Sequence, residues 1–173
     1  QVKSVELSMA EQRLVILLEH VGEGALCPEC SATCTRHDHA PARRWRHLDT
    51  MQFETVLEAR VPRVNCRQCG VKTCHVPWAG QHSRFTLLFE AFAIAVLEAS
   101  SSVSAAATLL RVGWDAVHDI MRRAVERGMV RRQVDDVTQV GIDEKSFRRG
   151  QDYVSLMTDL QGSRVLDVVP GRD

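Results

Sequence analysis

The sequence predicts an α+β protein with several domains. Three observations support this: two pairs of cysteines lie in a strand-rich N-terminal region, the hydrophobic period changes from two to about 3.6 residues after Pro77, and strand-like runs return after Gln139. We therefore expect a β-rich domain over residues 1–80, a helical domain over residues 83–130, and the first strands of an incomplete α/β domain over residues 138–173.

Composition places the chain among ordinary globular proteins. It has 173 residues, of which 45% are hydrophobic and 25% are charged, and its formal net charge is zero. No apolar run approaches the ~20 residues that cross a bilayer, and no signal peptide is recognisable, so we expect a cytoplasmic protein without a membrane partner. The chain begins with Gln1 rather than Met, as a fragment, a processed form or an edited sequence would.

Strands are predicted at both ends of the first region. Residues 2–7 and 14–18 form two β-rich runs, which we interpret as a hairpin, with a short helix over the second run as the alternative. Residues 51–61 alternate between two faces, with Leu57, Ala59 and Val61 on one and Glu58 and Arg60 on the other. Pro62 is expected to end this strand, which delivers Cys66 to a turn.

The paired cysteines predict a structural zinc site. Cys27 and Cys30 are separated by two residues, as are Cys66 and Cys69, and such a turn lets both sulfurs reach a tetrahedral Zn²⁺ at ~2.3 Å. The pairs are 66 − 30 − 1 = 35 residues apart, more than the usual ~15 to 20, and a hairpin inserted between them would account for the difference. Free cysteines and a redox pair are the alternatives, and nearby side chains could replace one ligand: Cys34, His37, Cys74 or His75.

The helical region has the pattern of a helix-turn-helix domain. Its first helix is expected to bury one apolar stripe and to begin after Ser83 as N-cap. A second helix is predicted over residues 103–110. Gly113 then precedes a third helix over residues 114–127, with Gly128 as its C-cap. The first stripe comprises Phe85, Leu88, Phe89, Phe92 and Val96.

This arrangement suggests double-stranded DNA as the partner. The strands and the two cysteine pairs of residues 1–80 predict a zinc ribbon. Zero net charge argues against a uniformly basic binder, but arginines cluster in this ribbon and at the end of the third helix. The third helix should lie in the major groove with Val117, Ile120 and Ala124 facing the core. The alternative is a plain helical bundle with a solvated basic face. Eight DNA-contacting residues are expected: Arg43, Arg44, Arg46 and Arg63 in the ribbon, and Asp115, His118, Arg122 and Arg123 on the third helix.

The C-terminal region is predicted to form the first strands of a further domain. After a polar linker over residues 131–138, a strand over residues 140–143 is expected to end at Asp143, followed by a hairpin from residues 153–160 and 165–169. A carboxylate at a strand end can share a metal ion with a phosphate, although it is more often only part of a capped turn.

Taken together, the chain resembles the ISL-three family of bacterial insertion-sequence transposases. The resemblance covers nearly the whole chain and rests on Cys27-Pro28-Glu29-Cys30, Trp45-Arg46-His47-Leu48-Asp49, residues 61–66, Val76-Pro77-Trp78, the helical region 85–128 and Gly141-Ile142-Asp143-Glu144.

This resemblance carries several implications. It implies a ribonuclease-H-like catalytic domain in which Asp143 is the first acid of an Asp-Asp-Glu triad, with Mg²⁺ or Mn²⁺ bound only in the complete domain. Cys69 occupies the fourth zinc position, which in this family is His or Cys.

The leading hypothesis is the N-terminal, DNA-binding part of a DDE transposase. It would recognise the terminal inverted repeats of an insertion sequence, act at the bacterial nucleoid, be compatible with a homodimer, and be inactive in catalysis as these 173 residues. The alternative is a zinc-ribbon and helix-turn-helix transcription regulator without enzymatic activity. The DNA target sequence and the oligomeric state do not follow from the sequence.

Overall fold

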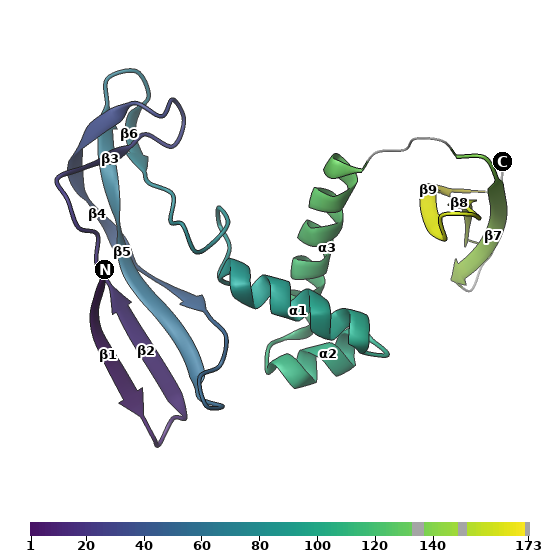
Figure 1. Cartoon of the computed structure of the whole chain (residues 1–173), viewed down its shortest axis with the longest axis horizontal. Coiled ribbons are helices and arrows are strands. Elements are labelled where there is room, and N and C mark those ends of the chain that lie inside the picture. Colours follow the sequence, from purple (N-terminus) through teal and green to yellow (C-terminus); the bar gives the residue numbers. More distant parts are fainter. Residues whose placement is uncertain (133–136, 149–151, 172–173) are drawn as a thin grey trace. The chain divides into compact units, whose positions relative to one another are not determined.

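The computed structural model describes residues 1–132, 137–148 and 152–171 (Figure 1). They form two compact units, Gln1–Val125 and Glu126–Asp173. Among the described residues, no helix has the length and apolar character needed to cross a membrane. The elements are β1 (Val2–Ser8), β2 (Arg13–Leu18), β3 (Gly24–Leu26), β4 (Thr33–Arg46), β5 (Glu54–Cys66), β6 (Gly70–Thr73), α1 (Leu87–Ala99), α2 (Val103–Leu110), α3 (Trp114–Arg131), β7 (Val140–Arg148), β8 (Asp152–Asp159) and β9 (Arg164–Pro170).

The N-terminal sheet is built around the long strand β5. Its order is β1-β2-β5-β4-β3, and β6 also pairs with β5. The predicted hairpin is confirmed as β1 and β2, so the alternative of a helix over residues 14–18 is wrong. β2 pairs with β5 in parallel, whereas β4 pairs with β5 antiparallel and supplies the hairpin partner that lies between the two cysteine pairs (Figure 1).

Pro62 does not end the strand, contrary to the expectation from sequence. β5 continues through it to Cys66. Pro62 faces His39, where the pairing of β4 with β5 shifts in register between His39 and Ala42. A β-bulge tolerates a residue that cannot donate to the ladder, and the Pro62 carbonyl still accepts from the Cys74 amide at 3.0 Å.

The core of the sheet confirms the predicted alternation. Leu57, Ala59 and Val61 are buried on one face of β5 and pack around Trp45, which is fully buried. Trp78, from the segment that follows β6, meets Trp45 edge to face at 5.6 Å between ring centroids. This segment therefore covers the sheet before the chain enters α1.

Helix α1 differs from its prediction in its cap and in its buried face. Thr86, not Ser83, is the N-cap, and its hydroxyl accepts from the Phe89 amide. Ser83 instead donates to Glu90 at 2.8 Å, so its hydroxyl is already engaged. Phe89 and Ala93 are buried, whereas Leu88 and Phe92 of the predicted stripe are 60% and 51% exposed. The core therefore takes a narrower face of α1 than the sequence suggested.

Helices α2 and α3 form the predicted helix-turn-helix. Their shared core with α1 includes Leu110, Val117 and Ile120. Arg111 ends α2 in the left-handed conformation, and the Gly113 carbonyl accepts from the amide of Ala116 at 3.1 Å. Gly128 does not end α3, because the helix continues to Arg131. An interior glycine costs a helix only about 1 kcal/mol.

The second sheet has the order β7-β8-β9 and is antiparallel. The expected hairpin is confirmed as β8 and β9. β7 does not end at Asp143: the strand runs on to Arg148 because β8 pairs with it as far as Asp152, which leaves Asp143 in mid-strand opposite Leu156. Residues 133–136 of the predicted polar linker lie outside the described residues.

Candidate metal centre and DNA-binding surface

Two tight turns carry the four cysteines. Cys27 and Cys30 lie between β3 and β4, where the Ser31 amide bonds back to the Cys27 carbonyl and the Cys27 amide to the Ala32 carbonyl, both at 2.9 Å. Cys66 ends β5, and Cys69 precedes Gly70, which pairs with Cys66 and has a φ of 72°. Because this φ is in the left-handed region, glycine suits the position. Each turn therefore presents two sulfurs on one side.

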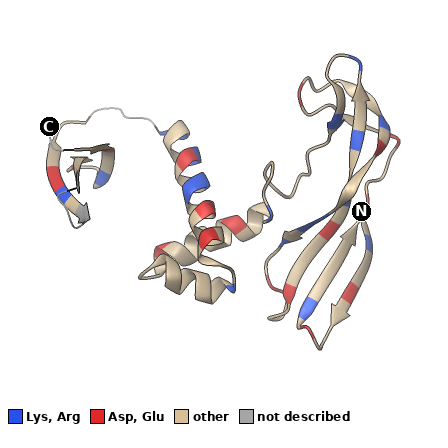
Figure 2. Cartoon of the chain, turned by 180° about the vertical axis from the view of Figure 1, so that it is seen from behind, with Lys and Arg blue, Asp and Glu red and all other residues tan. Residues whose placement is uncertain are grey.

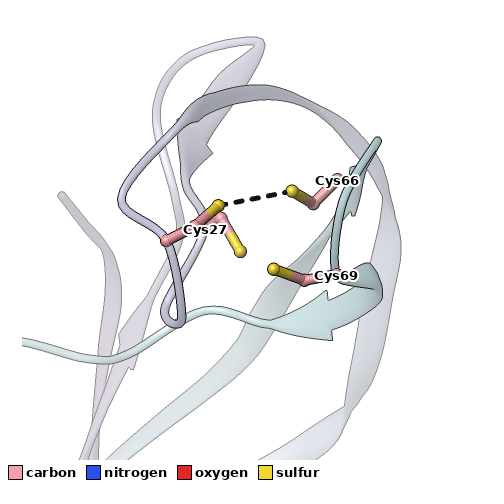
Figure 3. A group of neighbouring side chains, drawn as sticks. Cys27, Cys66 and Cys69 are labelled. Atoms are coloured by element: carbon pink, nitrogen blue, oxygen red, sulfur yellow. Dashed lines mark hydrogen bonds between the residues drawn. The ribbon is translucent and has the colours of Figure 1, made fainter.

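The four sulfurs form one compact group. They all lie within 4.8 Å of one another, and the sulfurs of Cys30 and Cys66 are 3.5 Å apart. Around a tetrahedral zinc ion with bonds of ~2.3 Å, neighbouring sulfurs lie about 3.8 Å apart. Figure 3 shows the sulfurs of Cys27, Cys66 and Cys69 pointing toward a common centre. The residues present therefore fit a Cys₄ zinc site.

The electrostatics of the group favour a bound cation. Backbone amides of Cys69 and then Gln68 lower the pKa of the Cys66 thiol to about 6. Hydrogen bonds with neighbouring thiols, first with Cys30, raise the pKa of Cys69. Four sulfurs this close would repel one another as thiolates, and a divalent cation would remove that repulsion.

The four alternative ligands lie outside this group. The Cys34 thiol donates to the Ala32 carbonyl at 3.4 Å, and the Cys74 thiol to the Leu26 carbonyl at 3.9 Å. His37 and His75 are exposed. Among the residues that the structure describes, the Cys₄ group is the one cluster of three or more His, Cys, Asp or Glu side chains that could hold a metal ion.

Residues 45–49 join the ribbon to the helices. Arg46 is 9% exposed, forms an ion pair with Asp49, and places its guanidinium 5.2 Å from the Phe89 ring of α1. Asp49 also forms an ion pair with Arg111, in the turn between α2 and α3. The sequence prediction of Arg46 as a DNA contact is therefore corrected: its side chain is used inside the protein. We call the residues Arg46, Asp49 and Arg111 the ribbon–helix clamp.

The clamp was missed by the sequence analysis. Asp49 belongs to the run that carries the family resemblance, but no pattern pairs it with Arg111, 62 residues away. A second contact supports the clamp, since Nδ1 of His47 is hydrogen-bonded at 2.9 Å to Thr86, the N-cap of α1.

The other three ribbon arginines that were predicted to contact DNA also have partners. Arg44 pairs with Glu58 at 2.6 Å, and Arg63 forms a bidentate ion pair with Asp38. Arg43 lies 5.0 Å from the Trp45 ring, and its other contact, with the Ser83 carbonyl, is long at 3.5 Å. Since carboxylates already neutralise Arg44 and Arg63, Arg43 is the member of the predicted set that best retains its charge for a phosphate.

Helix α3 presents a mixed face to solvent. Acidic and basic positions alternate along it (Figure 2). Asp115 is exposed, His118 stacks on Trp114 at 4.8 Å, and the Arg122 side chain is 54% exposed, 3.7 Å from Asp119. Val117 and Ile120 face the core as predicted, and Ala124 is half-buried.

Arg123 does not face outward, contrary to its prediction. Its side chain is 28% exposed and pairs at 2.9 Å with Glu90, a buried carboxylate of α1. Arg123 therefore neutralises a buried acid and ties α3 to α1.

Among the described residues of the second sheet, no acidic residue lies directly opposite Asp143. It is exposed and faces Leu156, which in turn faces Val168. No group of metal ligands around it occurs among the described residues. The described residues therefore do not fit a magnesium or manganese site at Asp143.

Comparison with known families gives three matches in order along the chain. Residues 23–69 match the zinc-finger of transposase IS204/IS1001/IS1096/IS1165, residues 74–125 match the helix-turn-helix domain of transposase family ISL3, and residues 140–173 match a family described as transposase. These matches cover the Cys₄ group, helices α1 and α2, most of α3, and the second sheet.

Individual relatives agree with these matches. The transposase for insertion sequence element IS1557 of Mycobacterium tuberculosis, in strains CDC 1551 / Oshkosh and H37Rv, is 32% identical over 151 residues, which are 85% of this chain and 33% of the relative. The transposase for insertion sequence element IS1001 of Bordetella parapertussis is 28% identical over 160 residues, which are 92% of this chain and 39% of the relative. No solved structure matches the chain significantly.

The chain thus spans about a third of the length of the curated relatives that it matches. Within that span it carries a zinc ribbon, a helix-turn-helix and a part of a transposase domain in the same order as the family matches. By these matches, the chain belongs to the ISL3 family of transposases.

Proposed function

We propose that this chain is the DNA-binding N-terminal part of a DDE transposase that recognises the ends of its insertion sequence. The observation that carries the proposal is the Cys₄ group at the tip of a sheet that is clamped to a helix-turn-helix within one compact unit. Two DNA-binding modules held together can contact one duplex at two places, and the terminal inverted repeats are the duplex that a transposase must find.

A structural Zn²⁺ held by Cys27, Cys30, Cys66 and Cys69 organises the ribbon in this proposal. The ion supplies no chemistry to a reaction. It holds two turns of a sheet together, and without it a small β-module loses much of its stability.

Helix α3 is the element that we place in the major groove. Its exposed residues Asp115 and Arg122 and the half-buried His118 offer carboxylate, guanidinium and imidazole groups to base edges and phosphates, and Arg43 of the ribbon offers a further phosphate contact. Arg44, Arg46, Arg63 and Arg123 are not included because acidic partners within the protein engage them.

We assign residues 138–173 to the opening of a ribonuclease-H-like domain, after a ribbon over residues 1–80 and a helix-turn-helix domain over residues 83–130. Asp143 is then the first acid of the catalytic triad, and Mg²⁺ or Mn²⁺ binds only when the complete domain supplies the others. Two-metal phosphoryl chemistry needs several carboxylates, of which Asp143 supplies one, so strand cleavage and joining are expected of the complete domain. Action at the bacterial nucleoid and a homodimer on paired ends are consistent with this role.

A binding titration tests the proposal. Fluorescence anisotropy compares a duplex of the terminal inverted repeat with a scrambled duplex of equal length at the same salt concentration. We expect tighter binding of the repeat, by at least about tenfold, and a loss of this preference in Arg122→Ala, since a base contact is worth ~1 to 3 kcal/mol. Equal affinity for both duplexes would leave the transcription-regulator alternative, whose preferred site would lie in a promoter.

A further inference from the structure

A hollow on the ribbon gathers cationic side chains, among them two arginines of the basic ribbon cluster that were not among the expected DNA contacts. It has a volume of about 340 Å³, and its polar lining comes from Lys3, Glu19, His20, Arg36, His39 and Arg60, with Leu17 and Leu18 between them. We call it the basic hollow. It holds three Lys or Arg side chains and two imidazoles but one carboxylate.

The order of the sheet creates this cluster. Lys3 lies on β1, Leu17 and Leu18 on β2, Arg60 on β5 and Arg36 on β4. These four strands are consecutive neighbours in the sheet, although the residues span 57 positions of sequence from Lys3 to Arg60 (60 − 3). The hollow therefore exists only when β2 pairs in parallel with β5.

The cations of the hollow are poorly neutralised. Among the described residues the Arg60 side chain has no hydrogen-bond or ion-pair partner, and the Arg36 side chain donates only to the Gly22 carbonyl at 3.3 Å. Lys3 is 3.9 Å from Glu19, at the limit of an ion pair. Nδ1 of His20 is buried without a partner. In contrast, Arg44 and Arg63 on the same strands β4 and β5 are each held by a carboxylate.

We propose that the basic hollow binds the phosphate backbone of the DNA whose major groove α3 reads. The proposal rests on the proposed function and extends it, because it adds a second anchoring point through residues outside the predicted set. Guanidinium groups match phosphate oxygens in shape and charge, and two of them converge here with an ammonium group. The hollow lies in the same compact unit as most of α3, so one duplex is the occupant that both surfaces suit.

The test is the salt dependence of binding to the terminal-repeat duplex by the full 173-residue chain. In Arg36→Gln/Arg60→Gln, two phosphate contacts are lost. We expect the slope of log K against log salt to become less steep by about 2 × 0.9, and the affinity to fall on the order of tenfold per residue at 0.1 M salt. The scrambled duplex should weaken by the same factor, since a backbone contact does not read sequence.

A matched control is available on the same strands. Arg44→Gln/Arg63→Gln also removes two positive charges, so the change in net charge is identical, but both arginines are already neutralised by Glu58 and Asp38. We expect its salt slope to equal that of the unaltered chain. Arg36→Lys/Arg60→Lys keeps the charge of the hollow and should keep most of the slope. Zinc content and circular dichroism establish that each variant is folded.

The outcomes separate this inference from the proposed function. If the unaltered chain shows no preference for the repeat, the proposed function fails. Suppose that the unaltered chain does prefer the repeat. The basic hollow is then not a phosphate site if Arg36→Gln/Arg60→Gln leaves the salt slope unchanged, or if Arg44→Gln/Arg63→Gln changes the slope by the same amount. A poly-glutamate peptide that binds the chain more tightly than the duplex does, and loses affinity in the hollow pair, would show that the partner is an acidic protein and overturn the proposal.

Discussion

Cys66 is the cysteine of the group whose surroundings most favour the thiolate form. It is 4% exposed, and two backbone amides, those of Cys69 and Gln68, point at its sulfur and lower its pKa. The lowered pKa favours the thiolate, which is the form of cysteine that binds a metal cation. Cys69 differs, because hydrogen bonds with neighbouring thiols, first with Cys30, raise its pKa and favour its protonated form until a metal binds.

Replacing Cys66 should therefore abolish the metal site. In Cys66→Ser we expect zinc content to fall from one equivalent to near zero and the ribbon to unfold, since apparent binding free energies of structural zinc are ~10 to 16 kcal/mol. Metal analysis and circular dichroism measure the two effects. Cys34→Ser is the control, because Cys34 lies outside the group and should retain full zinc. A full equivalent in Cys66→Ser, or its loss in Cys34→Ser, would show that the ligand set is wrong.

Asp159 should make the second sheet sensitive to acid. The backbone amide of Gly162 first, and then Arg164, hold the pKa of this carboxyl below its ordinary value of about 3.9, and the residue is 5% exposed. A folded-state pKa below the unfolded one gives stability that is present above pH ~4 and is lost as the pH falls through the lower, folded-state value.

Asp159→Asn should remove this acid sensitivity. We expect faster hydrogen exchange of the Gln161 and Gly162 amides at neutral pH and a weaker change on acidification than in the unaltered chain. Identical exchange rates and identical acid dependence in the two proteins would contradict this account of the turn.

At the level of the elements, the turn between α2 and α3 is held to the ribbon by one ribbon residue, Asp49. Asp49 contacts both Arg46 and Arg111, and its side chain is 31% exposed. In Asp49→Asn, Arg46 would remain buried at 9% exposure without a carboxylate. We expect a loss of about 2 kcal/mol of stability, less than for a fully buried pair because the site is partly open to water.

Thermal denaturation and limited proteolysis between residues 79 and 86 measure this effect. We expect a lower Tm and faster cleavage of that segment as the ribbon loosens from α1. Glu58→Gln is the control, since its pair with Arg44 is more exposed and should contribute less than about 1 kcal/mol. Equal losses in both variants would mean that Asp49 has no special role in joining the ribbon to the helices.

The elements also show how far sequence reasoning reaches. The alternation around Leu57 was enough to predict a half-buried strand, although not its continuation through Pro62 to Cys66, and the spacing of the cysteines was enough to predict which sulfurs come together. The N-cap of α1 was predicted at Ser83, whereas Thr86 is the observed cap. Both residues can cap a helix, and only the position of Glu90 decides which of the two hydroxyls is already occupied.

The charged residues were the least predictable part of the site. Arg36, Arg43, Arg44, Arg46, Arg60 and Arg63 are alike in sequence, and their roles depend on which strand pairs with which. A hairpin was expected between the cysteine pairs, but the bounds of β4 could not be predicted because its 14 residues include Pro41 and a polar run. Without its register, the pairing of Arg44 with Glu58 and of Arg63 with Asp38 could not be foreseen. The clamp and the basic hollow were missed for the same reason: they join residues that are distant in the chain.

At the scale of the whole molecule, we propose that a zinc-organised ribbon and a helix-turn-helix together recognise insertion-sequence ends. The two modules share one compact unit, and the clamp connects the ribbon to the turn that precedes α3. Metal bound at one tip of the sheet should therefore affect DNA binding even though no sulfur contacts DNA in this account.

The most direct test is to titrate the terminal-repeat duplex with chain carrying one equivalent of zinc and with the same chain after removal of the metal by a chelator. We predict specific binding in the first case, loss of most of the affinity in the second, and recovery when zinc is restored. Equal affinity for the repeat with and without bound zinc would contradict the claim that the Cys₄ site organises the DNA-binding unit.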